Sequence, residues 1–205
     1  MFLLNKFSKS QVYNLLSSLK FFEKEFFALD SRTINILKSE ITRITNCFVS
    51  DSEITKTFCS KRNEINFRGF KDVINKGKIV VLNMNINEYR NLSRIIAAYL
   101  KLDFQTEVLR RLSNSSSSNI HPVAFISDEY SEYVSATDAN FFSQSRESKC
   151  INVVSTQSYT SLLNAISNKY SVEVIVQNLV NKLWFRSDDI YTIEEAQKQI
   201  GKVDK

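Results

Sequence analysis

The stretch His121-Pro-Val-Ala-Phe-Ile-Ser-Asp-Glu-Tyr130 decides how this chain is expected to fold. The residues from Val123 to Ser127 are apolar or small and favour a strand, which ends at Asp128 and Glu129. A buried strand that ends on two carboxylates has the form of a Walker B element. In such an element the first carboxylate binds Mg²⁺ through water, and the second polarises the water that attacks the γ-phosphate of ATP. The same residues also fit a core strand that runs into a helix, because Asp and Glu favour the first helical turn.

The composition is that of a globular protein with one core and room for a small helical subdomain. The chain has 205 residues, 43% of them hydrophobic, and only three Gly and one Pro, which favours long helices joined by polar loops. No apolar run approaches the roughly 20 residues needed to cross a bilayer, and residues 1–4 are too few for a signal peptide. Cys47, Cys59 and Cys150 lack the spacing of a zinc site. A cytoplasmic protein with reduced thiols is expected.

Charge is distributed unevenly along the chain. Residues 1–120 carry 19 basic and 11 acidic side chains, a net charge of +8, whereas residues 121–205 carry 8 and 11, a net charge of −3. A basic part beside an acidic part fits a protein that contacts nucleic acid with one region and holds Mg²⁺ with another. A solvated basic surface explains the same distribution.

The first part of the chain is expected to be helical. Apolar residues recur every three or four positions over residues 9–29, which predicts an amphipathic helix. A second helix is expected after the N-cap Asp30, and a third, short one after Asp51. The aromatic residues within 21–27 could stack on bases, but their helical spacing favours a place in the core.

The chain contains no phosphate-binding loop of its own. The pair Gly77-Lys78 invites comparison with the motif G-x-x-x-x-G-K-[ST], but Asp72 stands where a glycine is needed and Ile79 where Ser or Thr is needed. Without a loop of backbone amides around the phosphates, this polypeptide alone is not expected to bind ATP tightly.

The order of segments around the acidic strand predicts an α/β architecture. A strand at 78–83 is expected to lead into a long helix at 87–112 and then the acidic strand, which forms a parallel crossover unit. A helix at 129–145 and a strand at 150–155 follow, and this second strand runs into Gln157. An amide beside an acidic strand end can sense a γ-phosphate, although Gln157 also fits an ordinary helix start. The remaining expected segments are a helix at 158–166, a helix or strand at 172–177, a strand at 181–186, and a helix between Asp189 and Gly201.

These segments resemble the type IV secretion coupling proteins of the TraG/TraD type, which are hexameric DNA-translocating ATPases of conjugation. The resemblance is carried by four stretches: Pro122-Val-Ala-Phe-Ile-Ser-Asp-Glu-Tyr130, Ser143-Gln-Ser-Arg-Glu-Ser-Lys-Cys-Ile-Asn-Val-Val-Ser-Thr-Gln157, Leu162-Leu-Asn-Ala-Ile166, and Gln177-Asn-Leu-Val-Asn-Lys-Leu-Trp-Phe-Arg-Ser-Asp-Asp189. It implies a mostly parallel, RecA-like sheet of four or five strands, which is part of a P-loop NTPase motor domain that lacks its P-loop. It further implies an all-helical subdomain at 1–75 and the C-terminal half of the nucleotide-binding domain at 76–205.

The resemblance also assigns roles to individual residues. Asp128 corresponds to the Walker B carboxylate that holds Mg²⁺ through water, and Glu129 to the residue that activates the attacking water. Gln157 corresponds to the γ-phosphate sensor. Arg146 corresponds to an arginine ahead of the sensor strand, which is expected to stabilise charge at a neighbouring subunit's nucleotide, although an arginine at a helix end also commonly pairs with a carboxylate or the helix dipole. ATP and Mg²⁺ are the cofactors that the resemblance implies.

The implied function is that of a segment of a conjugative coupling protein, which couples ATP hydrolysis to the transfer of DNA and relaxase. The expected partners are DNA, relaxase and relaxosome proteins, secretion-channel components, and further copies of the chain in a hexamer if it belongs to a complete motor. The expected location is the cytoplasmic face of the inner membrane. Because the phosphate-binding loop and the family's membrane helices are missing from this sequence, the resemblance leads us to expect a fragment, a split subunit or a remnant without hydrolysis. Enzymatic activity therefore stays open.

Two other functions fit the sequence. The chain could keep the fold as a non-catalytic interaction module that binds substrate or relaxosome proteins. It could also be a helical nucleic-acid-binding protein in which the acidic strand end has no role. The motor interpretation requires Asp128, Glu129 and Gln157 to lie at one edge of the sheet.

Overall fold

The computed structural model describes residues 9–61, 63–114 and 121–201. The chain forms two compact units, Met1–Ile65 and Asn66–Lys205. The expected boundary after residue 75 would separate α4 (Phe70–Asn75) from α5 (Ile86–Asn114), although these two helices pack against each other within the second unit.

The first unit consists of helices, as the sequence predicts. It contains α1 (Lys9–Phe21), the π-helical turn η2 (Phe22–Phe26), α2 (Ser31–Val49) and α3 (Ser52–Phe58). Asp30 caps α2 by accepting a hydrogen bond from the backbone N–H of Thr33, at 3.0 Å. Asp51 caps α3 through the backbone N–H groups of Glu53 and Ile54, both at 2.9 Å. Both predicted N-caps are therefore confirmed, because a short carboxylate at these positions satisfies N–H groups that have no partner inside the helix.

The apolar residues of the first unit are poorly covered. Leu16 of α1 is 53% exposed and Ile41 of α2 is 58% exposed, and α2 has no buried residue. The aromatic rings between Phe21 and Phe27 contact one another, with centroids 5.4 to 6.4 Å apart, but Phe27 stays 69% exposed. The prediction that these rings belong to a core is wrong for this chain taken by itself.

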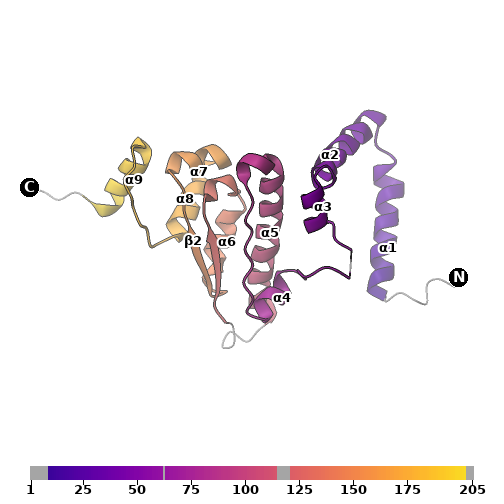
Figure 1. The fold of residues 1–205 in the computed structure, drawn as a ribbon, viewed down its shortest axis with the longest axis horizontal. Helices are drawn as coiled ribbons and strands as arrows, with labels where there is room; N and C mark the ends of the chain where they lie inside the picture. Colours follow the sequence, from indigo (N-terminus) through magenta and orange to yellow (C-terminus); the bar gives the residue numbers. More distant parts are fainter. Residues whose placement is uncertain (1–8, 62, 115–120, 202–205) are drawn as a thin grey trace, which may run out of the picture. The chain divides into compact units, whose positions relative to one another are not determined.

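The second unit is mixed α/β and mostly helical (Figure 1). After α4 and α5 come the strand β1 (Val123–Ser127), the 3₁₀ turn η4 (Tyr130–Glu132), α6 (Asp138–Ser145), the strand β2 (Cys150–Val154), α7 (Tyr159–Ile166), α8 (Lys169–Asn178) and α9 (Ile190–Ile200). β1 and β2 pair in parallel, with Val123 opposite Cys150 and Ser127 opposite Val154. The crossover between them runs through α6, which packs against β2 and α8. Parallel pairing brings the ends of both strands to the same edge.

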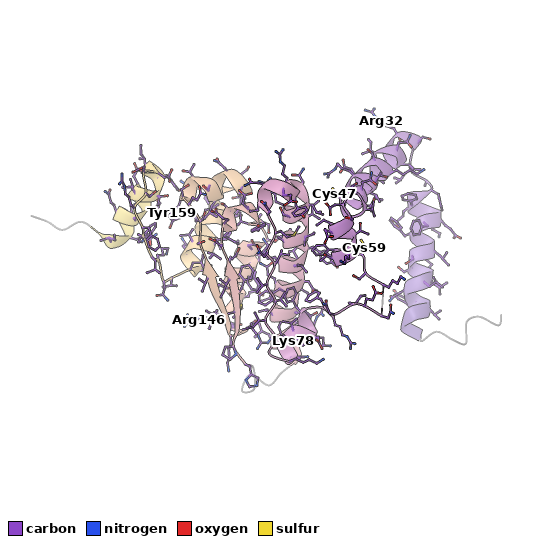
Figure 2. All side chains as sticks on the ribbon, in the orientation of Figure 1. Arg32, Cys47, Cys59, Lys78, Arg146 and Tyr159 are labelled. Atoms are coloured by element: carbon purple, nitrogen blue, oxygen red, sulfur yellow. The ribbon has the colours of Figure 1, made fainter. Side chains whose placement is uncertain are left out.

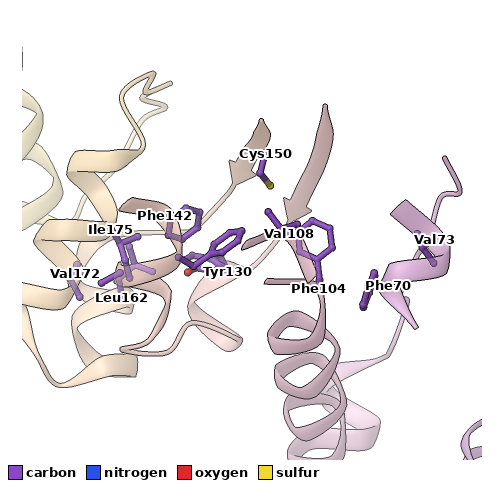
Figure 3. Close-up of a cluster of buried hydrophobic side chains, with 12 residues drawn as sticks. Phe70, Val73, Phe104, Val108, Tyr130, Phe142, Cys150, Leu162, Val172 and Ile175 are labelled. Carbon is purple, nitrogen blue, oxygen red and sulfur yellow. The ribbon is translucent and has the colours of Figure 1, made fainter. Parts of the chain in front are cut away.

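One apolar core holds this unit together. Buried residues from α4, α5, α6, α7 and α8 meet beside the strands (Figure 3). Phe104 of α5 lies on Phe125 of β1 with ring centroids 5.7 Å apart, and Tyr130 meets Phe142 of α6 edge to face at 6.0 Å. Val108 is fully buried. The residues after β1 are therefore tied to the core through Tyr130.

The two further strands expected at 78–83 and 181–186 do not form. Neither segment has regular secondary structure, and within the described chain no main-chain hydrogen bond connects residues 79–84 or 181–186 to a strand. Ile79 is 90% exposed and Leu183 is 88% exposed, so these residues gain little from burial. The described residues thus contain a two-stranded sheet in place of the four or five strands expected. An apolar segment forms a strand only where a neighbouring strand offers main-chain hydrogen bonds and other residues cover its side chains.

The helices around the acidic strand differ from expectation in two places. The helix predicted over 129–145 is replaced by η4, a turn, and α6. Glu129 adopts a left-handed conformation with φ 46° and ψ 45°, so no α-helix begins at this residue. The long helix predicted at 87–112 is confirmed as α5, with a kink at Arg90 (φ 37°, ψ −109°). The last helix is also confirmed, with Asp189 as its N-cap and Gly201 as its C-cap.

Candidate functional site

The carboxyl ends of β1 and β2 are joined beyond the last paired residues. The backbone N–H of Ser155 donates to the carbonyl of Ser127 at 2.9 Å, and the N–H of Tyr130 donates back to the carbonyl of Ser155 at 2.8 Å. These two bonds hold the residues that follow β1 against those that follow β2. Polar side chains from two distant parts of the sequence therefore share one edge of the sheet.

Asp128 is the first carboxylate at this edge. Its Oδ1 accepts a hydrogen bond from the Ser155 hydroxyl and another from the backbone N–H of Glu129, at 2.9 Å. The Ser155 hydroxyl, followed by the Glu129 N–H, lowers the pKa of the Asp128 carboxyl, since both stabilise the ionised form. Asp128 is therefore anionic at neutral pH, and none of the hydrogen bonds in the described chain uses its Oδ2.

Glu129 is held in a conformation that residues with side chains rarely adopt. Its φ of 46° and ψ of 45° lie in the left-handed region, where a residue other than glycine costs roughly 1–3 kcal/mol. Such strain persists only where the surrounding structure imposes it, and it is concentrated at functional sites. At Glu129 the turn brings the side chain toward β2.

Gln157 meets Glu129 across the strand ends. Its Nε2 lies 3.3 Å from Oε1 and 3.4 Å from Oε2 of Glu129. Both side chains line an open cleft of about 520 Å³ whose other walls come from α5, the turn after β1, and α7. Its lining comprises Arg94, Glu129, Ser131, Glu132, Val134, Gln157, Ser161, Asn164 and Ala165. The structure thus places Glu129 and Gln157 in contact. Asp128 lies at the same edge of the sheet, bound to Ser155, but is not among the residues that line the cleft. The chemical roles of all three residues stay predictions.

Arg94 contributes the one positive charge among the residues that line this cleft. Its Nη2 donates to Oε2 of Glu132 at 2.6 Å and its Nε to the same oxygen at 3.1 Å. This pair connects α5 to the turn after β1. Because the Arg94 side chain is 56% exposed, water screens the pair, and such a contact contributes roughly 0–1 kcal/mol to stability.

A buried carboxylate, that of Asp138, binds residues of the turn that follows β1. Asp138 is completely buried, and its Oδ2 accepts hydrogen bonds from Lys101 Nζ at 2.5 Å and from the Tyr130 hydroxyl at 2.6 Å. Burial lowers the pKa of the Lys101 ammonium, and the Asp138 carboxylate opposes this shift. Burial, followed by the charge of Asp138, raises the pKa of the Tyr130 phenol. The phenol therefore keeps its proton and donates a hydrogen bond to the carboxylate.

Arg146 is not part of this cluster. It follows α6 and precedes β2, whereas Gln157 follows β2, so the two residues lie at opposite ends of the strand. Figure 2 shows this separation through Arg146 and Tyr159, which begins α7 just after Gln157. Within one chain Arg146 cannot reach the cleft, and its expected action on a neighbouring subunit stays a prediction.

The sequence interpretation missed the charged residues that α5 contributes. Lys101 and Gln105 both bind Asp138, with Gln105 Nε2 3.0 Å from Oδ1, and Arg94 binds Glu132. Their separations of seven and four residues place them on one face of a helix. Polar residues on one face of the otherwise apolar helix α5 were the signal in the sequence. Asp138, to which two of them bind, fell inside the helix predicted over 129–145, so it was not recognised as their partner.

Comparison with family models, curated proteins and solved structures finds no match to this chain. Where residues are described, no three His, Cys, Asp or Glu side chains gather as a metal site would require. The contact to Mg²⁺ expected of Asp128 runs through water and uses one carboxylate, so it does not require a cluster of three protein ligands. Across 9–61, 63–114 and 121–201, no helix is both long and apolar enough to cross a membrane.

Proposed function

We propose that this chain is the catalytic-carboxylate part of an ATP-driven, coupling-protein-like translocase, with a RecA-like motor fold that is completed by other polypeptide. The observation that carries the proposal is the contact of the Glu129 carboxylate with the Gln157 amide, at 3.3 and 3.4 Å, across the ends of adjacent parallel strands. A water-activating carboxylate and a phosphate-sensing amide need this neighbourhood, because both act on the same terminal phosphate.

The donor set suits the cofactors that the proposal requires. Asp128 is ionised and offers its Oδ2, so it fits a water-mediated contact to Mg²⁺. Bound Mg²⁺ would neutralise charge on the phosphates. Glu129 would orient the attacking water and accept its proton, and Gln157 would sense the phosphate through its amide. A phosphate-binding loop must come from another polypeptide or from a part of the protein outside this sequence.

One face of the two-stranded sheet exposes its apolar side chains, and this supports the same proposal. Ile126 of β1 is 73% exposed, and Ile151 and Val153 of β2 are 56% and 52% exposed. Phe125 and Cys150, whose side chains point the other way, pack into the core beside the helices. Parallel sheets are normally covered on both faces, so a further layer of the motor domain is expected on this side.

The family's partners and location belong to the proposal. DNA, relaxase and relaxosome proteins would be the cargo, secretion-channel components would receive it, and further copies would complete a hexamer at the cytoplasmic face of the inner membrane.

A mixing experiment tests this function. The chain is combined with a polypeptide that carries the G-x-x-x-x-G-K-[ST] loop of a coupling protein, and ATP hydrolysis is measured. The chain alone should be inactive and the mixture active, and Glu129→Gln should lower the turnover of the mixture by about 10²–10⁴-fold. Glu173→Gln, at a half-exposed position of α8 outside the cleft, is the matched control and should leave turnover unchanged. Equal turnover with Glu129→Gln would refute the role of Glu129.

A second function has an observation of its own. The uncovered apolar residues on α1 and α2 fit a non-catalytic module that binds substrate or relaxosome proteins. If the mixture forms a complex but never hydrolyses ATP, while the chain captures a relaxosome protein and loses it on Ile41→Arg, this second function is supported instead.

A further inference from the structure

The buried carboxylate of Asp138 gathers donors from three parts of the second unit. Lys101 and Gln105 reach it from α5, at 2.5 and 3.0 Å. Ser135 contributes its backbone N–H at 3.0 Å and its hydroxyl at 3.1 Å, and the Tyr130 hydroxyl lies at 2.6 Å. The bond from the Ser135 N–H to the Asp138 carboxylate spans the residues just before α6, which begins at Asp138. A carboxylate with so many buried donors is held in one orientation.

Tyr130 connects the fixed Asp138 carboxylate to the backbone of Glu129. Its backbone N–H binds the Ser155 carbonyl at 2.8 Å, and its hydroxyl binds Asp138, so both ends of the residue are anchored. On the other side of Glu129, the Asp128 carboxylate is bound to Ser155. Glu129 therefore sits between two anchored neighbours, which explains how it keeps a left-handed conformation that its own side chain disfavours.

The same network holds the far end of the turn. Lys101 Nζ donates to the carbonyl of Tyr133 at 2.5 Å, and the backbone N–H of Tyr133 donates to the carbonyl of Tyr130 at 3.0 Å. The turn from 129 to 133 is thus attached to α5 and to Asp138 beneath the cleft. If these attachments are lost, Glu129 is free to return to a right-handed or extended conformation, which turns its side chain away from β2.

From this arrangement we propose that Asp138 is a positioning residue, which acts through Tyr130 and Lys101 to keep the Glu129 carboxylate against Gln157. Asp138 itself lines no part of the cleft and touches no reacting group. The proposal rests on the proposed function only in naming Glu129 as the group that must be positioned. The experiment that tests it detects the contact between Glu129 and Gln157 directly. Its result therefore does not depend on whether ATP is hydrolysed.

Tyr130→Phe is the decisive variant, because it removes one hydroxyl from Asp138 while the ring keeps its contact with Phe142. The readout is the side-chain amide signal of Gln157 in ¹H–¹⁵N spectra, assigned with Gln157→Glu. In Tyr130→Phe this signal should move to the position of an exposed glutamine such as Gln197. The amide of Asn178, which binds Val174 on α8 at 2.8 Å, should not move.

Control variants distinguish a change in the position of Glu129 from a general loss of folded structure. Tyr170→Phe removes a hydroxyl from an exposed ring of α8, a helix that supplies no donor to Asp138, and it should leave the Gln157 signal in place. Asp138→Asn, if it folds, should move the signal further than Tyr130→Phe. An unchanged Gln157 signal in folded Tyr130→Phe overturns the proposal, and so does a shift of the Asn178 amide of the same size.

Discussion

The buried pair of Lys101 and Asp138 allows a quantitative test of what stabilises the second unit. Only 4% of the Lys101 side chain and none of the Asp138 side chain is exposed, and their charged atoms lie 2.5 Å apart. Removal of one partner from a buried ion pair leaves an uncompensated charge, which costs about 3–5 kcal/mol. We expect Asp138→Asn to lower the free energy of unfolding by this amount, because asparagine keeps the shape of aspartate without its charge.

The second step of the test is the double variant. Lys101→Met removes the charge that Asp138→Asn leaves behind, so the double variant should be about 2 kcal/mol more stable than Asp138→Asn alone. By contrast, Glu173→Gln breaks an exposed pair in which the charged atoms are 3.7 Å apart, and it should change stability by less than about 0.5 kcal/mol.

Urea unfolding measures these differences. Trp184, the single tryptophan of the chain, stacks on Tyr159 with ring centroids 5.7 Å apart, so its fluorescence reports on the second unit. With a slope of roughly 2 kcal/mol per molar urea, Asp138→Asn should lower the midpoint by about 1.5–2.5 M. Strictly additive effects of the two substitutions, or a cost below about 1 kcal/mol for Asp138→Asn, would refute the reasoning.

Four further results are expected. Burial raises the pKa of the Cys150 thiol from 9.0 to about 11, so at pH 8 an aromatic disulfide reagent should label Cys150 at least about a hundredfold more slowly than the exposed Cys59, as followed by absorbance. Because this pKa is raised on folding, its contribution to stability is complete below about pH 9 and is lost as the pH rises through about 11, which unfolding measured across that range would detect. Ser155→Ala should raise the pKa of Asp128 in a ¹³C titration, since the Ser155 hydroxyl is the main cause of its lowered value. Asp51→Ala should destabilise α3 by about 1 kcal/mol through loss of its N-cap, visible as faster amide exchange, and Asp51→Asn should largely preserve the helix.

Much of the fold followed from local patterns. The N-caps at Asp30, Asp51 and Asp189 were predicted from residue type and spacing, and each carboxylate accepts a backbone N–H of the helix that it begins. The strands that contain Phe125 and Asn152 were also predicted. These features depend on interactions within a few residues, which the sequence displays directly.

The candidate site was predictable only in part. Asp128, Glu129 and Gln157 were expected at one edge because parallel strands end there, and the structure places all three at that edge, with Glu129 and Gln157 in contact. Arg94 and Asp138 were missed, since their partners lie 38 and 37 residues away in the chain. No periodicity links residues at such distances.

The amino-acid order alone was enough to place the helices, their caps and the acid pair at the end of β1, because each depends on neighbours along the chain. Only the tertiary structure decided that Glu129 turns left-handed and that a lysine and an aspartate are buried beneath it. It also decided that the apolar segments at 78–83 and 181–186 join no strand among the residues that the structure describes. The physical reason is common to these cases: the energy of a strained turn, a buried charge or a strand depends on groups that come close only when the chain folds.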